Sequence, residues 1–170
     1  MDQTQIDSLI ADLYSTDGMR RQRARAALVE IGEPAVPALI QALDAHEAHA
    51  HWEAAKALSQ IGSPRAAHRF VELLGADKEF GVRWLAGEGL ISMGVPAIEP
   101  LLDALIERPG SVWLREGAHH VLHDLITRRL LPSAMVQTLS PVYEALRGPA
   151  AEAAVPGAAA RARKTLYGRG

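Results

Sequence analysis

Three stretches of the chain decide the fold, because they match one another when they are aligned. They are RQRARAALVEIGEPAVPALIQAL (residues 21–43), HWEAAKALSQIGSPRAAHRFVELL (residues 51–74) and RWLAGEGLISMGVPAIEPLLDAL (residues 83–105). In each stretch a leucine is followed four residues later by a glycine, and two residues after that by a proline. The leucines that set this register are Leu28, Leu58 and Leu90, spaced 30 and 32 residues apart. A period of this length is typical of a protein built from stacked structural repeats.

Each period is predicted to form two helices joined by a tight corner. Ala54, Ala57, Leu58 and Ile61 follow the i, i+3, i+4, i+7 spacing that places side chains on one stripe of a helix. The glycine supplies the left-handed position that ends this helix, and the proline suits the first turn of the next one. Since no stretch alternates apolar and polar residues as a strand does, the sequence indicates an all-α protein.

A fourth and weaker copy, REGAHHVLHDLITRRLLPSAMVQTL, covers residues 115–139. It keeps the leucine, as Leu122, but it has no glycine at the corner and its proline is delayed to Pro132. Repeats near the end of a stack often depart from the pattern in this way. After Pro156 and Gly157 we expect a last short helix over residues 158–167.

We expect one domain over the whole chain. Its predicted parts are an N-terminal capping helix (residues 1–18), the repeats (residues 19–139) and C-terminal capping helices (residues 140–170).

Composition excludes several classes of protein. The 170 residues include no cysteine, which excludes a disulfide framework, a cysteine zinc site and a thiol nucleophile. No apolar run approaches the roughly 20 residues of a membrane span, and the first residues do not resemble a secretion signal. The formal net charge of −2 argues against general attraction to polyanions. We therefore expect a cytoplasmic protein that does not associate with membranes.

The sequence resembles the HEAT repeat family, in the short form found in phycobilisome-lyase-like repeats. The resemblance is strongest in ARAALVEIGEPAVPAL (residues 24–39) and continues with substitutions in AGEGLISMGVPAIEPL (residues 86–101). It implies a right-handed α-solenoid, or α-α superhelix, of about five helix pairs. Similar solenoids are mostly protein-binding scaffolds. Rarer members attach pigments, oxidise a lysine-derived side chain at two irons, or excise damaged DNA bases.

A solenoid binds its partners mainly along the concave face, which the second helix of each repeat tends to line. On that helix, the positions six and two residues before the reference leucine lie on one flank, beside the core. They bring together two tryptophans and several charged groups, and Trp113 lies about one turn further upstream. The candidate binding residues are Trp52, Lys56, Trp84, Glu88, Trp113, Glu116 and His120. Tryptophan often dominates binding energy at interfaces, and the alternative is that these rings only fill gaps between repeats.

Four residues have the spacing of metal ligands. Glu116 stands three and four residues before His119 and His120, and His123 follows, so carboxylate and imidazole share one side of a helix. The lysine-oxidising HEAT enzymes carry His-Glu pairs six and five residues before the reference leucine, and this chain has none in that register. We therefore predict no metal and no other cofactor, and keep these four residues as the candidate ligands if a metal is bound.

The predicted function is that of a non-enzymatic scaffold binding a protein or peptide, as a monomer or within a larger complex. One alternative is a metal-dependent or lyase-like accessory enzyme, although no nucleotide-binding or hydrolase motif is present. The other is a nucleic-acid-binding protein. We do not favour it, because Glu53, Glu88 and Glu116 on the same flank would repel phosphates.

Overall fold

A computed structural model describes residues 3–44, 47–76 and 78–168, and this part of the chain contains helices and no strand. Three short 3₁₀ turns, each opening the helix that follows it, lie at Glu33–Ala35, Pro64–Ala66 and Val95–Ala97. The α-helices are α1 (Gln3–Asp12), α2 (Gly18–Ile31), α3 (Val36–Ala42), α4 (Ala48–Ile61), α5 (Ala67–Ala76), α6 (Phe80–Met93), α7 (Ile98–Glu107), α8 (Val112–Thr127), α9 (Ser133–Arg147) and α10 (Ala151–Tyr167). The predicted all-α class is confirmed for the described residues.

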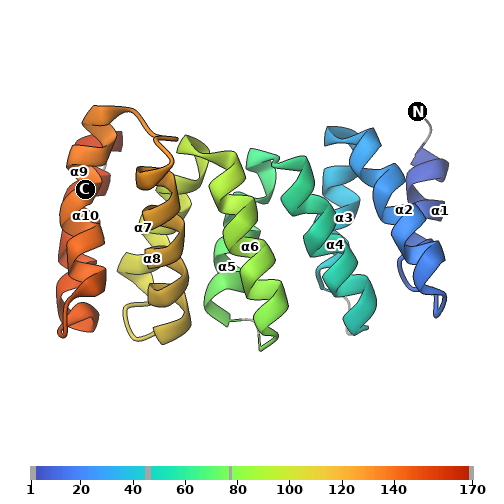
Figure 1. Cartoon of the computed structure of the whole chain (residues 1–170), viewed down its shortest axis with the longest axis horizontal. Helices are drawn as coiled ribbons and strands as arrows, with labels where there is room; N and C mark the ends of the chain where they lie inside the picture. The colour runs from blue at the N-terminus through green and yellow to red at the C-terminus, as the bar shows by residue number, and fades with distance from the viewer. Residues whose placement is uncertain (1–2, 45–46, 77, 169–170) are drawn as a thin grey trace. The chain divides into compact units, whose positions relative to one another are not determined.

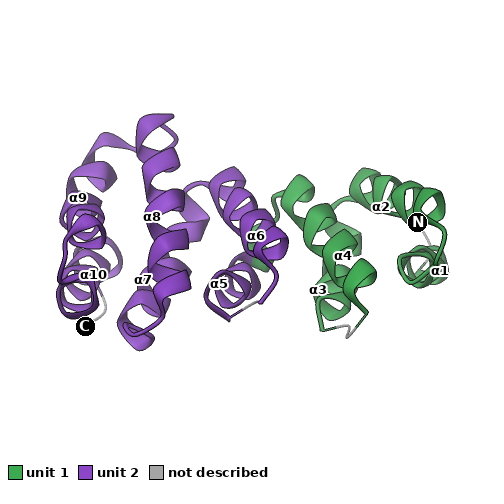
Figure 2. Ribbon diagram, turned by 60° about the horizontal axis from the view of Figure 1, so that its bottom comes forward, with its two compact units in different colours: residues 1–66 green, residues 67–170 purple. Residues whose placement is uncertain are grey.

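The chain divides into two compact units, Met1–Ala66 and Ala67–Gly170, shown in different colours in Figure 2. In the first unit α1 packs against α2 and α3 against α4, while α2 and α4 lie together in one layer and α1 and α3 in the other. The prediction of a single domain, with its boundaries at residues 18 and 139, stays a prediction. No helix in the described part of either unit is long and apolar enough to cross a membrane.

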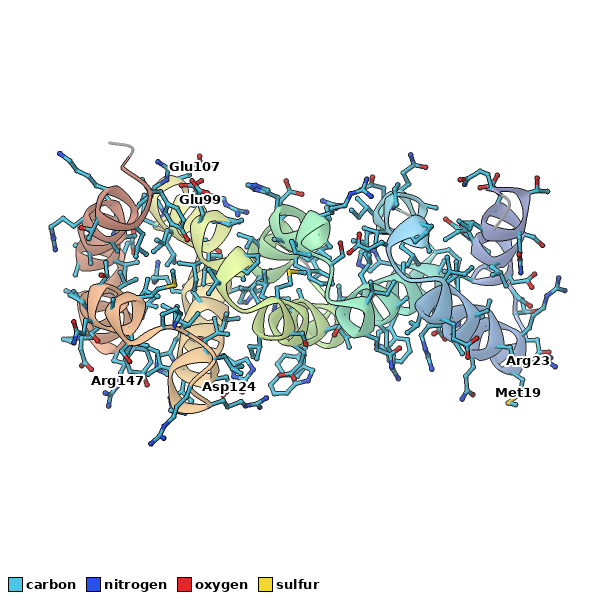
Figure 3. The ribbon with its side chains drawn as sticks, turned by 90° about the horizontal axis from the view of Figure 1, so that it is seen from above. Met19, Arg23, Glu99, Glu107, Asp124 and Arg147 are labelled. Carbon is cyan, nitrogen blue, oxygen red and sulfur yellow. The ribbon has the colours of Figure 1, made fainter. Side chains whose placement is uncertain are left out.

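In the second unit, hairpins α5/α6 and α7/α8 stack so that α6 lies beside α8 and α5 beside α7 (Figure 1). The last pair departs from the order that the fourth aligned copy predicts, because α9 packs on α8 and α10 packs on α7. In Figure 3, Asp124 of α8 and Arg147 of α9 accordingly lie on one side of the unit, opposite Glu99 and Glu107 of α7. The tight corner is replaced by a longer connection over residues 128–132, in which Arg129 adopts a φ of 57°.

The corners of the first three copies contain the predicted glycines, all with positive φ. Gly62 has the expected left-handed conformation, with φ 67° and ψ 23°. Gly94 has φ 67° and ψ −125°, so it lies in the mirror image of the β region, which glycine alone enters readily. The prolines after these glycines fall in the 3₁₀ turns, just before the helices that they were expected to open.

The C-terminal helix is longer than predicted, because Pro156 and Gly157 do not interrupt it. Helix α10 begins at Ala151 and buries Val155 and Ala159, and it packs against both α7 and α9. Burial of one apolar face outweighs the weak helix propensity of these two residues. Arg163 ties the same helix to α7 through an ion pair with Asp103, and its Nη2 lies 3.8 Å from Glu99 Oε1.

The register predicted from the repeats is confirmed, because Leu28, Leu58, Leu90 and Leu122 are all fully buried. We expect Leu90→Ala to lower the thermal midpoint by several degrees, since emptying a buried leucine site costs about 2–5 kcal/mol. Ser92→Ala is the matched control, because Ser92 is exposed on the same helix. Thermal melts followed by circular dichroism make the comparison, and equal midpoints for both variants would contradict this expected cost of emptying the Leu90 site.

Candidate functional site

The site in the second unit depends on the way α5 approaches its neighbours. A Cβ atom built on Gly89 of α6 would overlap the ring of Phe70, and one on Gly117 of α8 would lie 2.5 Å from Leu74 Cγ. Because neither glycine has a side chain, Phe70 and Leu74 pack directly against the backbones of α6 and α8. These contacts hold α6 and α8 side by side with their outer faces clear of α5.

A pocket of about 260 Å³ opens between α6 and α8. Its lining combines aromatic rings, two glycines and a few charged groups. The residues are Leu74, Phe80, Arg83, Trp84, Gly87, Trp113, Glu116, Gly117 and His120.

Three large aromatic side chains around this pocket are exposed: Phe80 at 70%, Trp84 at 48% and Trp113 at 42%. The Trp84 ring stacks on His120, with centroids 4.8 Å apart and an angle of 26° between the planes. The Arg83 guanidinium lies 4.5 Å from the centroid of the Trp113 ring. Both contacts join α6 to α8, so the exposed rings are held in place by the protein itself.

Charged groups complete the pocket. His120 Nε2 lies 3.3 Å from Glu88 Oε1, which places Glu88 next to the pocket wall. Glu116 is exposed, and within the described part of the chain it makes no hydrogen bond or ion pair. The pocket therefore offers one carboxylate, Glu116, that is available to a binding partner.

The structure brings together five of the seven residues predicted to form a binding surface. Trp84, Trp113, Glu116 and His120 line the pocket, and Glu88 adjoins it through His120. The other two lie in the first unit, where Lys56 Nζ lies 4.5 Å above the Trp52 ring. A continuous binding surface over all seven residues stays a prediction.

The surroundings of Trp52 are basic. The Arg25 guanidinium lies 5.9 Å from the ring centroid, from the side of α2. Glu53, next in sequence, is buried in an ion pair with Arg25, and Arg21 Nε lies 3.8 Å from its other carboxylate oxygen. Trp52 is half-buried in this packing, in contrast to the exposed tryptophans of the second unit.

The predicted ligand set Glu116, His119, His120 and His123 does not come together as one site. His119 stacks on Tyr143 of α9 at 5.2 Å, and His123 Nδ1 lies 2.8 Å from the Tyr143 hydroxyl oxygen. Burial lowers the pKa of His119, and the neighbouring His123, Arg147 and His120 lower it further. Since α9 packs on α8, two of the histidines face α9 while His120 faces α6, a separation that spacing along one helix does not reveal.

Sequence reasoning missed five residues that line the pocket: Leu74, Phe80, Arg83, Gly87 and Gly117. Phe80 stands one turn before Trp84 on α6, so the i, i+4 spacing of two aromatics was the available signal. Gly87 and Gly117 leave room for the pocket because they have no side chain. Leu74 had no signal, because its role depends on how closely α5 approaches Gly117.

Within each unit, successive helical hairpins stack so that their helices form two layers, which is the architecture of a helical-repeat protein. A family model for HEAT repeats matches residues 6–91, half of the chain, and the chain therefore belongs to the HEAT repeat family. One similar solved structure is that of the complex of CpcE and CpcF of phycocyanin lyase from Nostoc sp. PCC7120. The matched chain is 26% identical with a TM-score of 0.59, and the match covers 95% of this chain and 99% of that one. No curated protein sequence matches the chain.

Two glycines on α6 should respond differently to the same substitution. A Cβ at Gly87 would meet His120 Cδ2 at 3.5 Å, an ordinary contact, so Gly87→Ala should keep or raise the thermal midpoint because alanine favours helix by about 1 kcal/mol. Gly89→Ala should lower the midpoint, because the new methyl group overlaps Phe70. Thermal melts of the two variants test this packing, and a destabilised Gly87→Ala with an unchanged Gly89→Ala would contradict it.

Proposed function

We propose that the chain is a scaffold that binds a protein partner, and that the pocket between α6 and α8 is the centre of the binding surface. The observation that carries this proposal is the exposure of Phe80, Trp84 and Trp113 around one pocket. Exposed aromatic clusters are typical of protein interfaces, where tryptophan and tyrosine contribute much of the binding energy.

The size of the pocket favours a protein side chain over a free small molecule. At about 260 Å³ it lies below the range of roughly 300–1,000 Å³ that is typical of small-molecule sites. One large side chain of a partner fits this volume, with the surrounding rings covering its flanks. The exposed Glu116 carboxylate can accept a hydrogen bond from a basic or N–H group beside that side chain.

The aromatic rings are held rigidly before any partner arrives. Trp84 rests on His120, and Trp113 is covered by Arg83, so neither ring is free to take many rotamers. Binding therefore loses little side-chain entropy, which makes a small contact area more effective. In the first unit, Trp52 and Lys56 are candidates for a further contact with the partner.

The comparison with known structures supports a protein partner of a particular kind. The similar chain belongs to a complex of two proteins, CpcE and CpcF. We propose that this chain likewise pairs with a second helical-repeat chain, which would cover the aromatic pocket.

A second candidate function is that of one subunit of a two-chain lyase. The observation that favours it is the 26% identity to a chain of the phycocyanin lyase complex over nearly its whole length. The test is to incubate the chain and its captured partner with a pigment and an acceptor protein, and then to denature the mixture. Pigment absorbance that stays with the denatured acceptor protein shows covalent attachment. If the reconstituted pair attaches no pigment, the lyase function is refuted and only the scaffold role remains.

The scaffold proposal predicts which substitutions release the partner. Affinity purification from the native host, read by quantitative mass spectrometry, should show a helical-repeat protein captured by the wild-type chain. Trp84→Ala and Trp113→Ala should reduce its recovery by about tenfold or more, since removing an interface tryptophan typically costs at least 2 kcal/mol.

Val95→Ala is the matched control, because Val95 is an exposed apolar residue of the same unit outside the pocket. It should leave capture unchanged. Gly87→Ala should weaken capture while the fold remains stable, because the methyl group occupies part of the pocket. Equal recovery of the same partner by wild type, Trp84→Ala and Gly87→Ala would refute the pocket as the binding site.

A further inference from the structure

Three side chains from two helices converge beside the aromatic pocket. Glu88 comes from α6, while His120 and Asp124 come from α8, where their i, i+4 spacing places them on one side of the helix. Each offers one ligand atom, and the three atoms lie within 4.8 Å of one another. In the part of the chain that the structure describes, no other group of three His, Asp or Glu side chains is as close. Asp124 is labelled in Figure 3, on the side of the second unit that α8 shares with α9.

We propose that Glu88, His120 and Asp124 bind a divalent transition-metal ion of the zinc type. One imidazole and two carboxylates suit such an ion, because zinc-type ions bind both imidazole nitrogen and carboxylate oxygen. Magnesium and calcium bind almost only oxygen ligands. Three protein ligands leave one tetrahedral position for water or for a group supplied by a binding partner. The site shares only His120 with the set predicted by spacing, since Glu116, His119 and His123 take no part in it.

The geometry of the first pair of ligands supports this assignment. His120 Nε2 and Glu88 Oε1 are 3.3 Å apart, which is long for a charge-assisted hydrogen bond of about 2.7–2.9 Å. Two ligands that each lie about 2.0–2.1 Å from a tetrahedral zinc ion are roughly 3.3–3.4 Å from each other. The two atoms are therefore already at the separation that a shared ion requires.

The surroundings fix the ligands and leave a path for the ion. The Trp84 ring stacks on His120 and restricts the orientation of its imidazole. Both the His120 and Glu88 side chains keep about one third of their surface exposed, whereas Asp124 is more buried. An ion can thus reach the site from solvent without any movement of the helices.

One cation of the protein competes for the third ligand. Arg128 Nη2 lies 2.6 Å from Asp124 Oδ2, one turn further along α8. More than half of the Arg128 side chain is exposed, and exposed ion pairs contribute little to stability, so a metal ion can displace it. Removing Arg128 should therefore strengthen metal binding.

The test is a titration of the full, untagged chain with Zn²⁺ by isothermal calorimetry, with tryptophan fluorescence recorded alongside. We expect one equivalent of Zn²⁺ to bind and to change the emission of Trp84, which lies against the ligand His120. Glu88→Gln, which keeps the shape of the side chain, and His120→Ala should each lower the affinity on the order of 10–100-fold. Arg128→Ala should raise it.

His123→Ala is the matched control, because His123 is an exposed histidine on the same helix that faces α9. It should bind Zn²⁺ as the wild type does. Thermal melts without metal establish that each variant is folded. If His120→Ala does not fold, the affinity of Glu88→Gln for Zn²⁺ tests the site. The assignment is overturned by the absence of saturable binding near one equivalent, by an equal loss in His123→Ala, or by unchanged affinity in Glu88→Gln.

Discussion

Helix α5 approaches α6 and α8 more closely than side chains on the facing positions would allow. Phe70 occupies the space where a side chain at residue 89 would begin, and Leu74 does the same at residue 117. Interiors packed at this density respond to the addition of even one methyl group. The positions of Trp84 and His120 follow from this contact, because α6 and α8 are held where their outer side chains can stack.

The inverted last hairpin gives α8 two different neighbours. Had the last pair followed the pattern of the earlier repeats, α9 would lie beside α7 and α10 beside α8. Instead Tyr143 of α9 covers His119 and His123, and only His120 remains on the side of α6. Three histidines within five residues therefore have different environments, two against an aromatic ring of α9 and one between an indole and a carboxylate.

The sequence predicts those features of the fold that depend on local spacing. The buried leucines and the corner glycines follow from a period of 30 to 32 residues, and both were located correctly. The inversion of α9 and α10 was not predictable in this way. It depends on a connection in which Arg129 takes a positive φ without a glycine to signal it.

The same distinction applies to the site. Trp84 and Trp113 stood out because aromatic residues are scarce in this chain and these two lie near the start of equivalent helices. Phe80 could have been added by its i, i+4 spacing from Trp84 on the same helix, whereas Leu74 joins the pocket only because α5 packs closely against α8. Spacing of i, i+3 and i+4 along one helix could not show that Glu88 lies next to His120, because Glu88 comes from another helix.

The proposed partner site and the proposed metal site meet at His120, whose imidazole forms part of the pocket wall and also offers Nε2 to Glu88. An ion held by Nε2 would restrict rotation of the imidazole, and through the stacked rings it would restrict Trp84 as well. A partner that buries Trp84 then meets a ring that has already lost part of its freedom, so less conformational entropy is lost on binding. Linkage is reciprocal, which means that the partner must raise the affinity for the ion by the same factor. In this arrangement the ion would act on partner binding without touching the partner, because a single stacked pair of rings joins the two sites.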